Sequence, residues 1–320
     1  MSSTPKMIDQ YKSAYYQHEE PGYLRISGPD RMAFLQRQTT NDIGLLSPDQ
    51  SLVTVLTSPA GRILDVLWVI DEGEETLGVL TLPGQGDQTA EFLNKRIFFM
   101  DKVSIENKSD ALLQLDLFGG GTTKFIQELG LQLEIGENKI IAGSLAEVPI
   151  RILIHHELGS RILVPSAAVR QITSVLEHKN SLPLSLEDYE ILRVETGIPA
   201  AGHELVEDYT PLEIGFRWAI SENKGCYTGQ EVIARQVNYD KVTRQLVGLC
   251  IDETPHIGDT LYAQENNQPA GTITSLALSP RFGVIALAVI KRPFHQPGTE
   301  LILNNGDRVN KAVTNALPFQ

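Results

Sequence analysis

The sequence contains almost no cysteine: Cys226 and Cys250 are the only two in 320 residues. Two cysteines cannot build a disulfide framework, and Cys250 lies in the apolar, strand-like run 246–251. We therefore expect free thiols in a reducing compartment. Two thiols also fall short of the four thiolates that a conventional iron–sulfur cluster prefers, so Cys226 could offer a cluster only one ligand, in the company of another protein.

Long apolar runs and an excess of positive charge are also missing. No segment approaches about eighteen uninterrupted apolar residues, and residues 1–30 hold no cationic segment followed by an apolar run. Forty acidic against 27 basic side chains give a formal net charge of −13, which opposes attraction to nucleic acids and anionic membranes. We expect a cytoplasmic protein with no membrane partner and no direct nucleic-acid partner.

Patterns typical of metal and nucleotide sites are absent as well. The seven histidines form neither His-Glu-x-x-His nor His-x-x-x-His, and the glycines form no phosphate-binding fingerprint. His155 and His156 are adjacent on an expected strand and should point to opposite faces. The sequence predicts no metal site.

Apolar runs separated by turn residues indicate the architecture. Between 51 and 106 they predict strands with one helix at 87–96, an order that favours an antiparallel sheet with helices on one face. The pattern repeats in kind from 112 to 178. From 242 onward, short strands and polar turns suit a small barrel. We expect three domains, at residues 1–110, 111–240 and 241–320.

One short stretch concentrates special residues: NKGCYTGQEVIAR, at 223–235. Thr228 and Glu231, three positions apart, form a capping-box pattern before a short apolar run. This pattern predicts a helix that begins near Gly229.

Cys226 would then lie just before a helix N-terminus, with the cation of Lys224 two residues away. Both features favour the thiolate, so we expect a lowered thiol pKa and a reactive sulfur. The alternative is a small buried cysteine, as most free cysteines are.

The run Lys-Gly-Cys-Tyr-x-Gly-Gln-Glu at 224–231 resembles the signature of the YgfZ-type folate-binding proteins, within the aminomethyltransferase (glycine-cleavage T-protein) superfamily. FLQRQTTNDIGLL at 34–46 resembles the opening helix and turn of that family, and Gly-x-Ile-Thr-Ser at 271–275 resembles part of its last domain. The resemblance implies an α+β fold in three parts: two antiparallel sheet-plus-helix lobes and a C-terminal small β-barrel, with tetrahydrofolate in a central cavity.

Glu195 lies in LRVETGIP at 192–199, at the end of a helix that Ser185 caps and Gly197 ends. A carboxylate at that helix end is unfavourable by roughly 0.3–1 kcal/mol. In the resembling superfamily, the glutamate of an Arg-x-Glu-x-Gly stretch binds the pterin, whose ring N–H and exocyclic amine match a carboxylate fork. The resemblance thus implies that Glu195 binds the cofactor; the alternative is a solvated helix-end glutamate.

Asp65, in GRILDVLW at 61–68, matches the region where aminomethyltransferases carry two adjacent aspartates. The second position here is Val66, which cannot relay a proton, so one-carbon transfer has lost its acid–base group if that second carboxylate is the catalytic one. Asp65 is either a cofactor-binding residue or an outward strand residue. Arg235 is a candidate partner for a folate carboxylate, and Tyr227 of the cysteine motif is a further cofactor-binding candidate.

The family implies a tetrahydrofolate-binding accessory protein that supports the assembly or repair of iron–sulfur enzymes, including some that modify tRNA. Cys226 and Lys224 would be its reactive residues, and iron–sulfur client enzymes or assembly proteins its partners. The alternative is a folate-dependent aminomethyltransferase or demethylase. Whether the chain is an enzyme stays open at this point.

Overall fold

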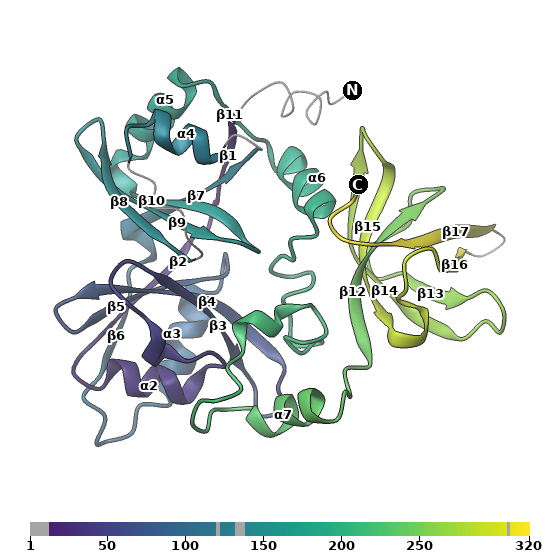
Figure 1. Ribbon diagram of the computed structural model, residues 1–320, viewed down its shortest axis with the longest axis horizontal. Coiled ribbons are helices and arrows are strands. Elements are labelled where there is room, and N and C mark those ends of the chain that lie inside the picture. Colours follow the sequence, from purple (N-terminus) through teal and green to yellow (C-terminus); the bar gives the residue numbers. More distant parts are fainter. Residues whose placement is uncertain (1–12, 120–121, 132–137, 306–307) are drawn as a thin grey trace.

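The computed structural model describes residues 13–119, 122–131, 138–305 and 308–320. These residues form two open sheets and a closed six-stranded barrel. In Figure 1 the two sheets lie one above the other on the left, and the barrel lies on the right, beyond helix α6. The expected α+β fold, with two sheet-plus-helix lobes and a C-terminal barrel, is confirmed.

The first sheet has the strand order β3-β4-β5-β2-β6 and is antiparallel throughout. Both faces of β4 are covered, which explains its nearly continuous apolar sequence. The elements of this lobe are β2 (Gly22–Ser27), α2 (Arg31–Gln38), η1 (Ile43–Leu45), β3 (Ser51–Thr57), β4 (Ile63–Gly73), β5 (Thr76–Thr81), α3 (Gly86–Asn94), β6 (Ser104–Asn107) and η2 (Ser109–Ala111).

One face of this sheet packs against α2 and α3 through Phe34, Leu35, Leu67 and Leu93, all of them buried. Asp30 precedes α2 as expected, but its side chain does not cap the helix. Its carboxylate instead accepts a hydrogen bond from the backbone N–H of Lys102, at 2.8 Å.

The second sheet has the order β11-β1-β7-β10-β9-β8. Its first strand, β1, precedes the first lobe in sequence but pairs with β7 and, in parallel, with β11. The two lobes are thus interleaved, and the three-domain division remains a prediction. The elements are β1 (Ser13–Gln17), β7 (Leu112–Phe118), α4 (Thr122–Glu128), β8 (Ile140–Leu145), β9 (Val148–His155), β10 (Gly159–Pro165), η3 (Ser166–Ala168), α5 (Val169–His178) and β11 (Ser181–Pro183).

Helix α6 (Leu186–Thr196) connects the lobes to the barrel. Its predicted ends are confirmed: Ser185 and Asp188 form a capping box, and Gly197 ends the helix in the left-handed conformation. The chain then crosses to the first sheet through η4 (Phe216–Ala219) and reaches α7 (Gln230–Asn238).

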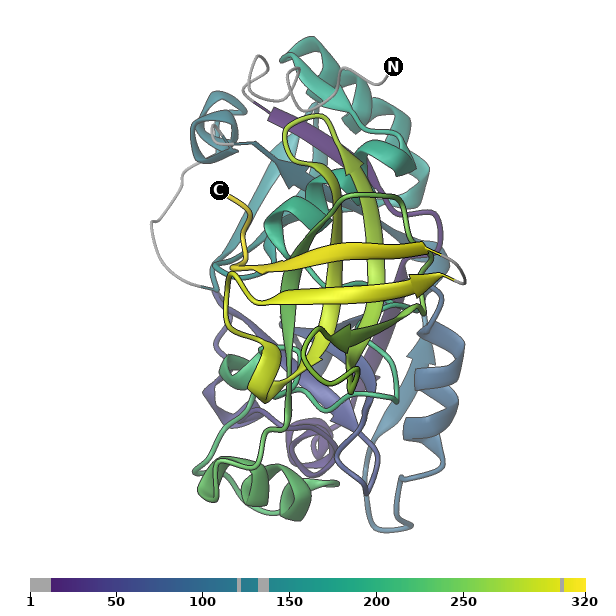
Figure 2. The same cartoon turned by 90° about the vertical axis from the view of Figure 1, so that its right-hand side faces the viewer.

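The barrel has the strand order β12-β15-β14-β13-β16-β17 and packs on α6 through an apolar cluster that includes Ile191, Val194 and Phe319. Figure 2 shows it in front of the two lobes. The weak alternation of RVNKAVTN did not predict its last strand. Its elements are β12 (Arg244–Ile251), β13 (Thr260–Ala263), β14 (Pro269–Ser279), β15 (Gly283–Lys291), η5 (Arg292–Phe294), β16 (Glu300–Asn305) and β17 (Arg308–Asn315).

Among the helices that the structure describes, none is both long and apolar enough to cross a membrane.

Candidate functional site

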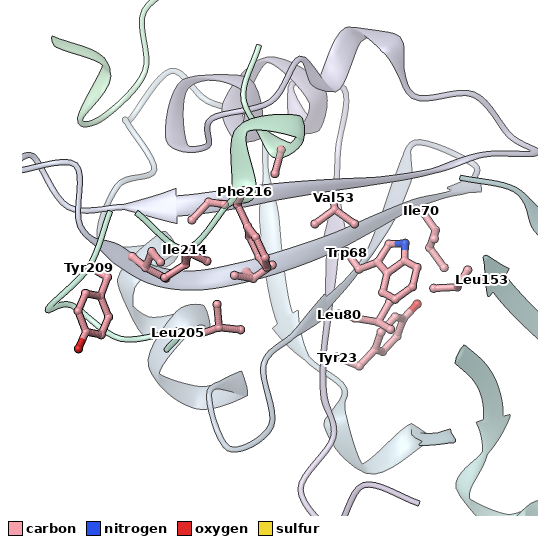
Figure 3. Packing of buried hydrophobic residues seen from close by; sticks show 14 of the residues in the cluster. Tyr23, Val53, Trp68, Ile70, Leu80, Leu153, Leu205, Tyr209, Ile214 and Phe216 are labelled. Atoms are coloured by element: carbon pink, nitrogen blue, oxygen red, sulfur yellow. The ribbon is translucent and has the colours of Figure 1, made fainter. Parts of the chain in front are cut away.

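A cavity of about 630 Å³ lies between the two sheets and the chain that follows α6. Much of its wall is apolar and aromatic. Figure 3 shows Val53, Trp68 and Leu80 from the first sheet beside Leu205 and Phe216 from the crossing chain, and all five line the cavity. The volume lies within the range of roughly 300–1,000 Å³ that is typical of small-molecule sites.

A largely buried group of polar side chains forms another part of the wall: His18, Asp116 and Arg161. Arg161 donates two hydrogen bonds to the carboxylate of Asp116, from Nε at 2.6 Å and from Nη2 at 3.0 Å. It donates a third to the side-chain oxygen of Gln114, at 2.9 Å. His18 Nε2 lies 2.8 Å from Asp116 Oδ2, the oxygen that also accepts the hydrogen bond from Arg161 Nη2. Strands β1, β7 and β10 are joined by this network.

The electrostatics of this group favour the charged forms of Asp116 and Arg161. Burial alone would raise the pKa of Asp116, but the charges of Arg161 and His18 outweigh it and hold that pKa well below its usual range. Burial would lower the pKa of Arg161, but the neighbouring carboxylate raises it further. The guanidinium carbon of Arg161 lies 5.5 Å from the ring centroid of Trp68, so a cation borders the apolar wall.

The other two carboxylates on the cavity wall, Glu190 and Glu157, differ in their partners. Glu190 accepts hydrogen bonds from Nε and Nη2 of Arg193, which is fully buried. The ion pair described for Glu157 is a long one, 3.6 Å to His156 Nε2, and its side chain is 53% exposed. Glu157 is therefore the cavity carboxylate with the most capacity to accept hydrogen bonds from a ligand.

A neutral histidine fixes the turn that carries Glu157. His155 Nδ1 accepts hydrogen bonds from the backbone N–H groups of Glu157 and Leu158, at 3.1 and 3.3 Å. Burial, with a contribution from the charge of His156, lowers the pKa of His155 to about 3, so the ring stays an acceptor at neutral pH. The prediction that His155 and His156 point to opposite faces is wrong: β9 ends at His155, and the two rings stack with centroids 4.7 Å apart.

Glu195, the predicted pterin ligand, is not among the residues that line the cavity. Its side chain is buried on the barrel side of α6, where Oε1 accepts a hydrogen bond from Ser279 Oγ at 2.6 Å. Oε2 lies 3.6 Å from Arg281 Nη1. The alternative of a solvated helix-end glutamate is wrong, because Glu195 is only 5% exposed. The unfavourable interaction of this carboxylate with the negative end of the helix dipole is offset by a hydroxyl donor and a cation from the barrel. Glu195 thus joins the barrel to the lobes.

Asp65 also points away from the cavity, whereas its neighbour Val66 lines it. Successive residues of a strand face opposite sides of the sheet. The carboxylate of Asp65 is fully buried and accepts hydrogen bonds from Thr89 Oγ1, at 2.5 Å, and from the backbone N–H groups of Val66 and Leu82. It connects β4 to α3, so neither the cofactor-binding role nor an outward position is supported. Burial raises the pKa of Asp65 to about 7, against these hydrogen bonds.

This raised pKa predicts a pH-dependent stability. The folded protein holds the Asp65 proton up to about pH 7, whereas the unfolded chain releases it near pH 4. The contribution of protonated Asp65 to the free energy of unfolding is therefore full below pH 4 and is lost as the pH rises to 7. Asp65→Asn keeps an acceptor for the two N–H groups and does not ionise. In denaturant titrations, the free energy of unfolding of the variant relative to that of wild type should increase by about 2–4 kcal/mol between pH 4 and pH 8. Parallel pH profiles would contradict this prediction.

Lys224 is buried, and its ammonium donates three hydrogen bonds to backbone carbonyls: Gln36 at 2.7 Å, and Thr39 and Asn41 at 2.6 Å each. These carbonyls lie at and just beyond the C-terminal end of α2, where a cation is favoured. Burial lowers the pKa of Lys224 to about 8, opposed by the charge of Asp42. Lys224 thus fixes the cysteine loop to α2, and its activation of a thiol stays a prediction.

Cys226 is exposed and Tyr227 is buried against Leu212 and Ile233. The ammonium of Lys224 lies 5.1 Å from the ring centroid of Tyr227. Burial raises the pKa of Tyr227 to about 12. The alternative of a sealed core cysteine is therefore wrong for Cys226, although neither it nor Tyr227 lines the cavity.

Helix α7 begins at Gln230, as expected, but not through the predicted capping box. Its N-cap is Gly229, in the left-handed conformation, and no side chain caps it. An added Cβ at Gly229 would lie 2.6 Å from the carbonyl oxygen of Ser58, so the close approach to the β3–β4 turn requires glycine. Arg235 lies on α7 in a shallow surface hollow with Tyr239 and Lys241, away from the cavity.

The sequence did not single out His18, Asp116 or Arg161. A signal was present: Asp116 in LLQLDLF and Arg161 in GSRILVP are charges inside otherwise apolar strands, which suggests buried partners. The register that places them opposite each other is a property of the sheet. Among the described residues, no group of three or more His, Cys, Asp or Glu side chains could hold a metal ion.

Comparisons with known proteins agree with this architecture. Residues 16–224 match a family model described as the GCVT N-terminal domain, and residues 244–319 match the glycine cleavage T-protein C-terminal barrel domain. A putative chloroplastic transferase of Arabidopsis thaliana is 31% identical over 79% of this chain, but the match spans only 59% of that relative. An aminomethyltransferase of Exiguobacterium sibiricum is 30% identical over 84% of this chain and 76% of its own length.

A solved structure shares the whole fold. The crystal structure of the glycine cleavage system aminomethyltransferase T from Bartonella henselae superposes with a TM-score of 0.84, covering 98% of this chain and 88% of that chain, at 20% identity. At that identity the likeness concerns the fold.

Proposed function

The chain belongs to the glycine cleavage T-protein family, and from that premise we propose that it binds a tetrahydrofolate in the central cavity as an accessory protein of iron–sulfur enzymes. The observation that carries the binding proposal is the cavity itself: aromatic walls, a buried cation and one carboxylate with spare acceptor capacity converge on about 630 Å³.

The donor and acceptor set suits a folate. A flat pterin fits against aromatic rings such as Trp68 and the stacked pair Tyr16 and Tyr189, whose centroids are 4.0 Å apart. Glu157 would accept the ring N–H and the exocyclic amine. It replaces Glu195 as the proposed pterin ligand. When bound, a tetrahydrofolate carries one-carbon units.

The position of Val66 argues against aminomethyl transfer. Of the Asp65–Val66 pair, the valine lines the cavity, while the carboxylate of Asp65 is turned into the core. If the second aspartate of that pair is the acid–base group in related transferases, as the resemblance implies, this cavity has lost it.

A folate titration tests the binding proposal. Glu157→Gln should weaken tetrahydrofolate binding by about 10–100-fold, because hydrogen bonds to a charged acceptor contribute roughly 1.5–3 kcal/mol. Glu195→Gln, the matched control, should leave the Kd within about threefold, since that side chain faces the barrel. Fluorescence titration or calorimetry provides both values. A wild-type protein that does not bind folate would refute the proposal.

The second candidate is a folate-dependent aminomethyltransferase or demethylase. The names of the relatives favour it, as does His18, an imidazole that is hydrogen-bonded to a carboxylate on the cavity wall. Incubation with tetrahydrofolate and an aminomethyl or N-methyl donor distinguishes the two. Formation of methylene-tetrahydrofolate at catalytic rates would establish the transferase.

The proposed role in the assembly or repair of iron–sulfur enzymes, including those that modify tRNA, rests on the resemblance of the cysteine loop to the YgfZ-type signature. In this proposal the exposed thiol of Cys226 acts on a partner. The cytoplasmic location is part of the proposal, and the Arabidopsis relative carries the description chloroplastic.

A further inference from the structure

The turn between α3 and β6 exposes three consecutive large apolar side chains. Phe98, Phe99 and Met100 are 63%, 97% and 72% exposed. Single exposed apolar residues are common on protein surfaces, but a contiguous group on a projecting turn is typical of an interaction site.

Hydrogen bonds hold this turn in one conformation. Asp101 accepts a bond from the backbone N–H of Phe98 through Oδ2, and its own N–H donates to the carbonyl of Phe98, both at 2.9 Å. Arg37 of α2 donates to both carboxylate oxygens of Asp101, at 2.8 Å each. A turn that is already ordered loses little entropy when it binds, so the apolar tip is presented ready for contact.

The segment that carries the tip is itself basic, although the chain is acidic. Residues 95–102 hold three cationic side chains, Lys95, Arg96 and Lys102, against the single carboxylate of Asp101, whereas the chain carries a net charge of −13. Lys95 pairs with Glu91 on the exposed surface, at 2.5 Å, where such pairs are weak and readily exchanged. A complementary surface would be apolar at its centre and acidic at its rim.

The turn and the cysteine loop border the same end of α2. Arg37, which holds the turn, accepts a hydrogen bond through its backbone carbonyl from the N–H of Thr228, at 3.3 Å. The preceding residue, Gln36, accepts one from Lys224. Figures 1 and 2 both place α2 and α7 along the same lower end of the molecule. The loop of the exposed Cys226 and the apolar tip are therefore both attached near the C-terminal end of α2.

We propose that residues 95–102 form a docking site for a protein that has an apolar pocket rimmed by carboxylates, and that docking brings this partner to Cys226. The inference rests on the proposed function, in which the partner is an iron–sulfur protein. An anionic bilayer suits the surface less well, because an extended bilayer would also meet the acidic remainder of the chain, whose net charge is −13.

Site-specific photocross-linking identifies the partner. The full chain carries p-benzoylphenylalanine in place of Phe99 or, as a matched control, in place of Leu278, which is 68% exposed on the barrel. We expect a defined adduct at position 99, absent at 278 and lost with Lys95→Glu/Lys102→Glu. If position 99 gives no such charge-dependent adduct, the proposal is wrong.

The cross-linked protein is then purified and titrated against the full chain. Phe99→Asp and Lys95→Glu/Lys102→Glu should each weaken the Kd at least about tenfold, and Leu278→Asp should leave it within about twofold. Equal affinity for wild type and Phe99→Asp would overturn the proposal, as would Phe99-dependent sedimentation with phosphatidylglycerol vesicles. Tetrahydrofolate titrations of the same variants keep the two hypotheses apart: failure of wild type to bind folate refutes the proposed function but not the docking site.

Discussion

Arg161→Met is expected to destabilise the protein by about 3–5 kcal/mol, because it leaves the carboxylate of Asp116 buried without its cation. The methionine retains most of the hydrocarbon volume but none of the hydrogen bonds to Asp116 and Gln114. His18 remains as one partner of Asp116, so the effect should not exceed this range. Denaturant unfolding at pH 7 measures it.

The pH dependence of this effect has a defined sign. The pKa of Asp116 is lowered in the folded protein, so its stabilising contribution is present above the unfolded value near 4 and is lost as the pH falls further. The difference between wild type and Arg161→Met should therefore shrink below about pH 4.

A double variant is the control for Arg161→Met. Arg161→Met/Asp116→Leu replaces the pair with apolar side chains, which is often neutral or stabilising relative to a broken pair. We expect it to be more stable than the single variant. A double variant that is no more stable would mean that the buried charge is not the cause.

Lys224→Met should destabilise the protein by about 2–4 kcal/mol, because three carbonyls around the end of α2 lose a charged donor. The loop that carries Cys226 should also open more often, so hydrogen exchange at 221–229 should accelerate. Lys241→Met is the matched control, since that lysine is exposed and its ammonium lies over the ring of Tyr239, 5.7 Å from the centroid.

The same variant tests whether Lys224 activates the thiol. If it does, the midpoint of the alkylation rate of Cys226 against pH should move upward in Lys224→Met. If the midpoint is unchanged while exchange accelerates, Lys224 is a structural anchor only, as its three carbonyl partners suggest.

Several features of the fold could be predicted because their signals are local. The capping box of Ser185 and Asp188, and the left-handed Gly197, set the ends of α6 through contacts within a few residues. The alternating strands and turns likewise predicted the barrel, apart from β17. The site was less predictable: the Lys-Gly-Cys-Tyr run located an exposed thiol and a structural lysine, but not the cavity.

By itself, the sequence determined the two ends of α6 and the valine in place of a second aspartate, since each depends on residue type and near neighbours. Only the tertiary structure decided where side chains point. His18 and Asp116 meet although 98 residues separate them, and Glu195 turns to Ser279 across 84. Such pairings follow from strand register and domain packing, which bring distant residues into contact and determine toward which side of its strand or helix each carboxylate points.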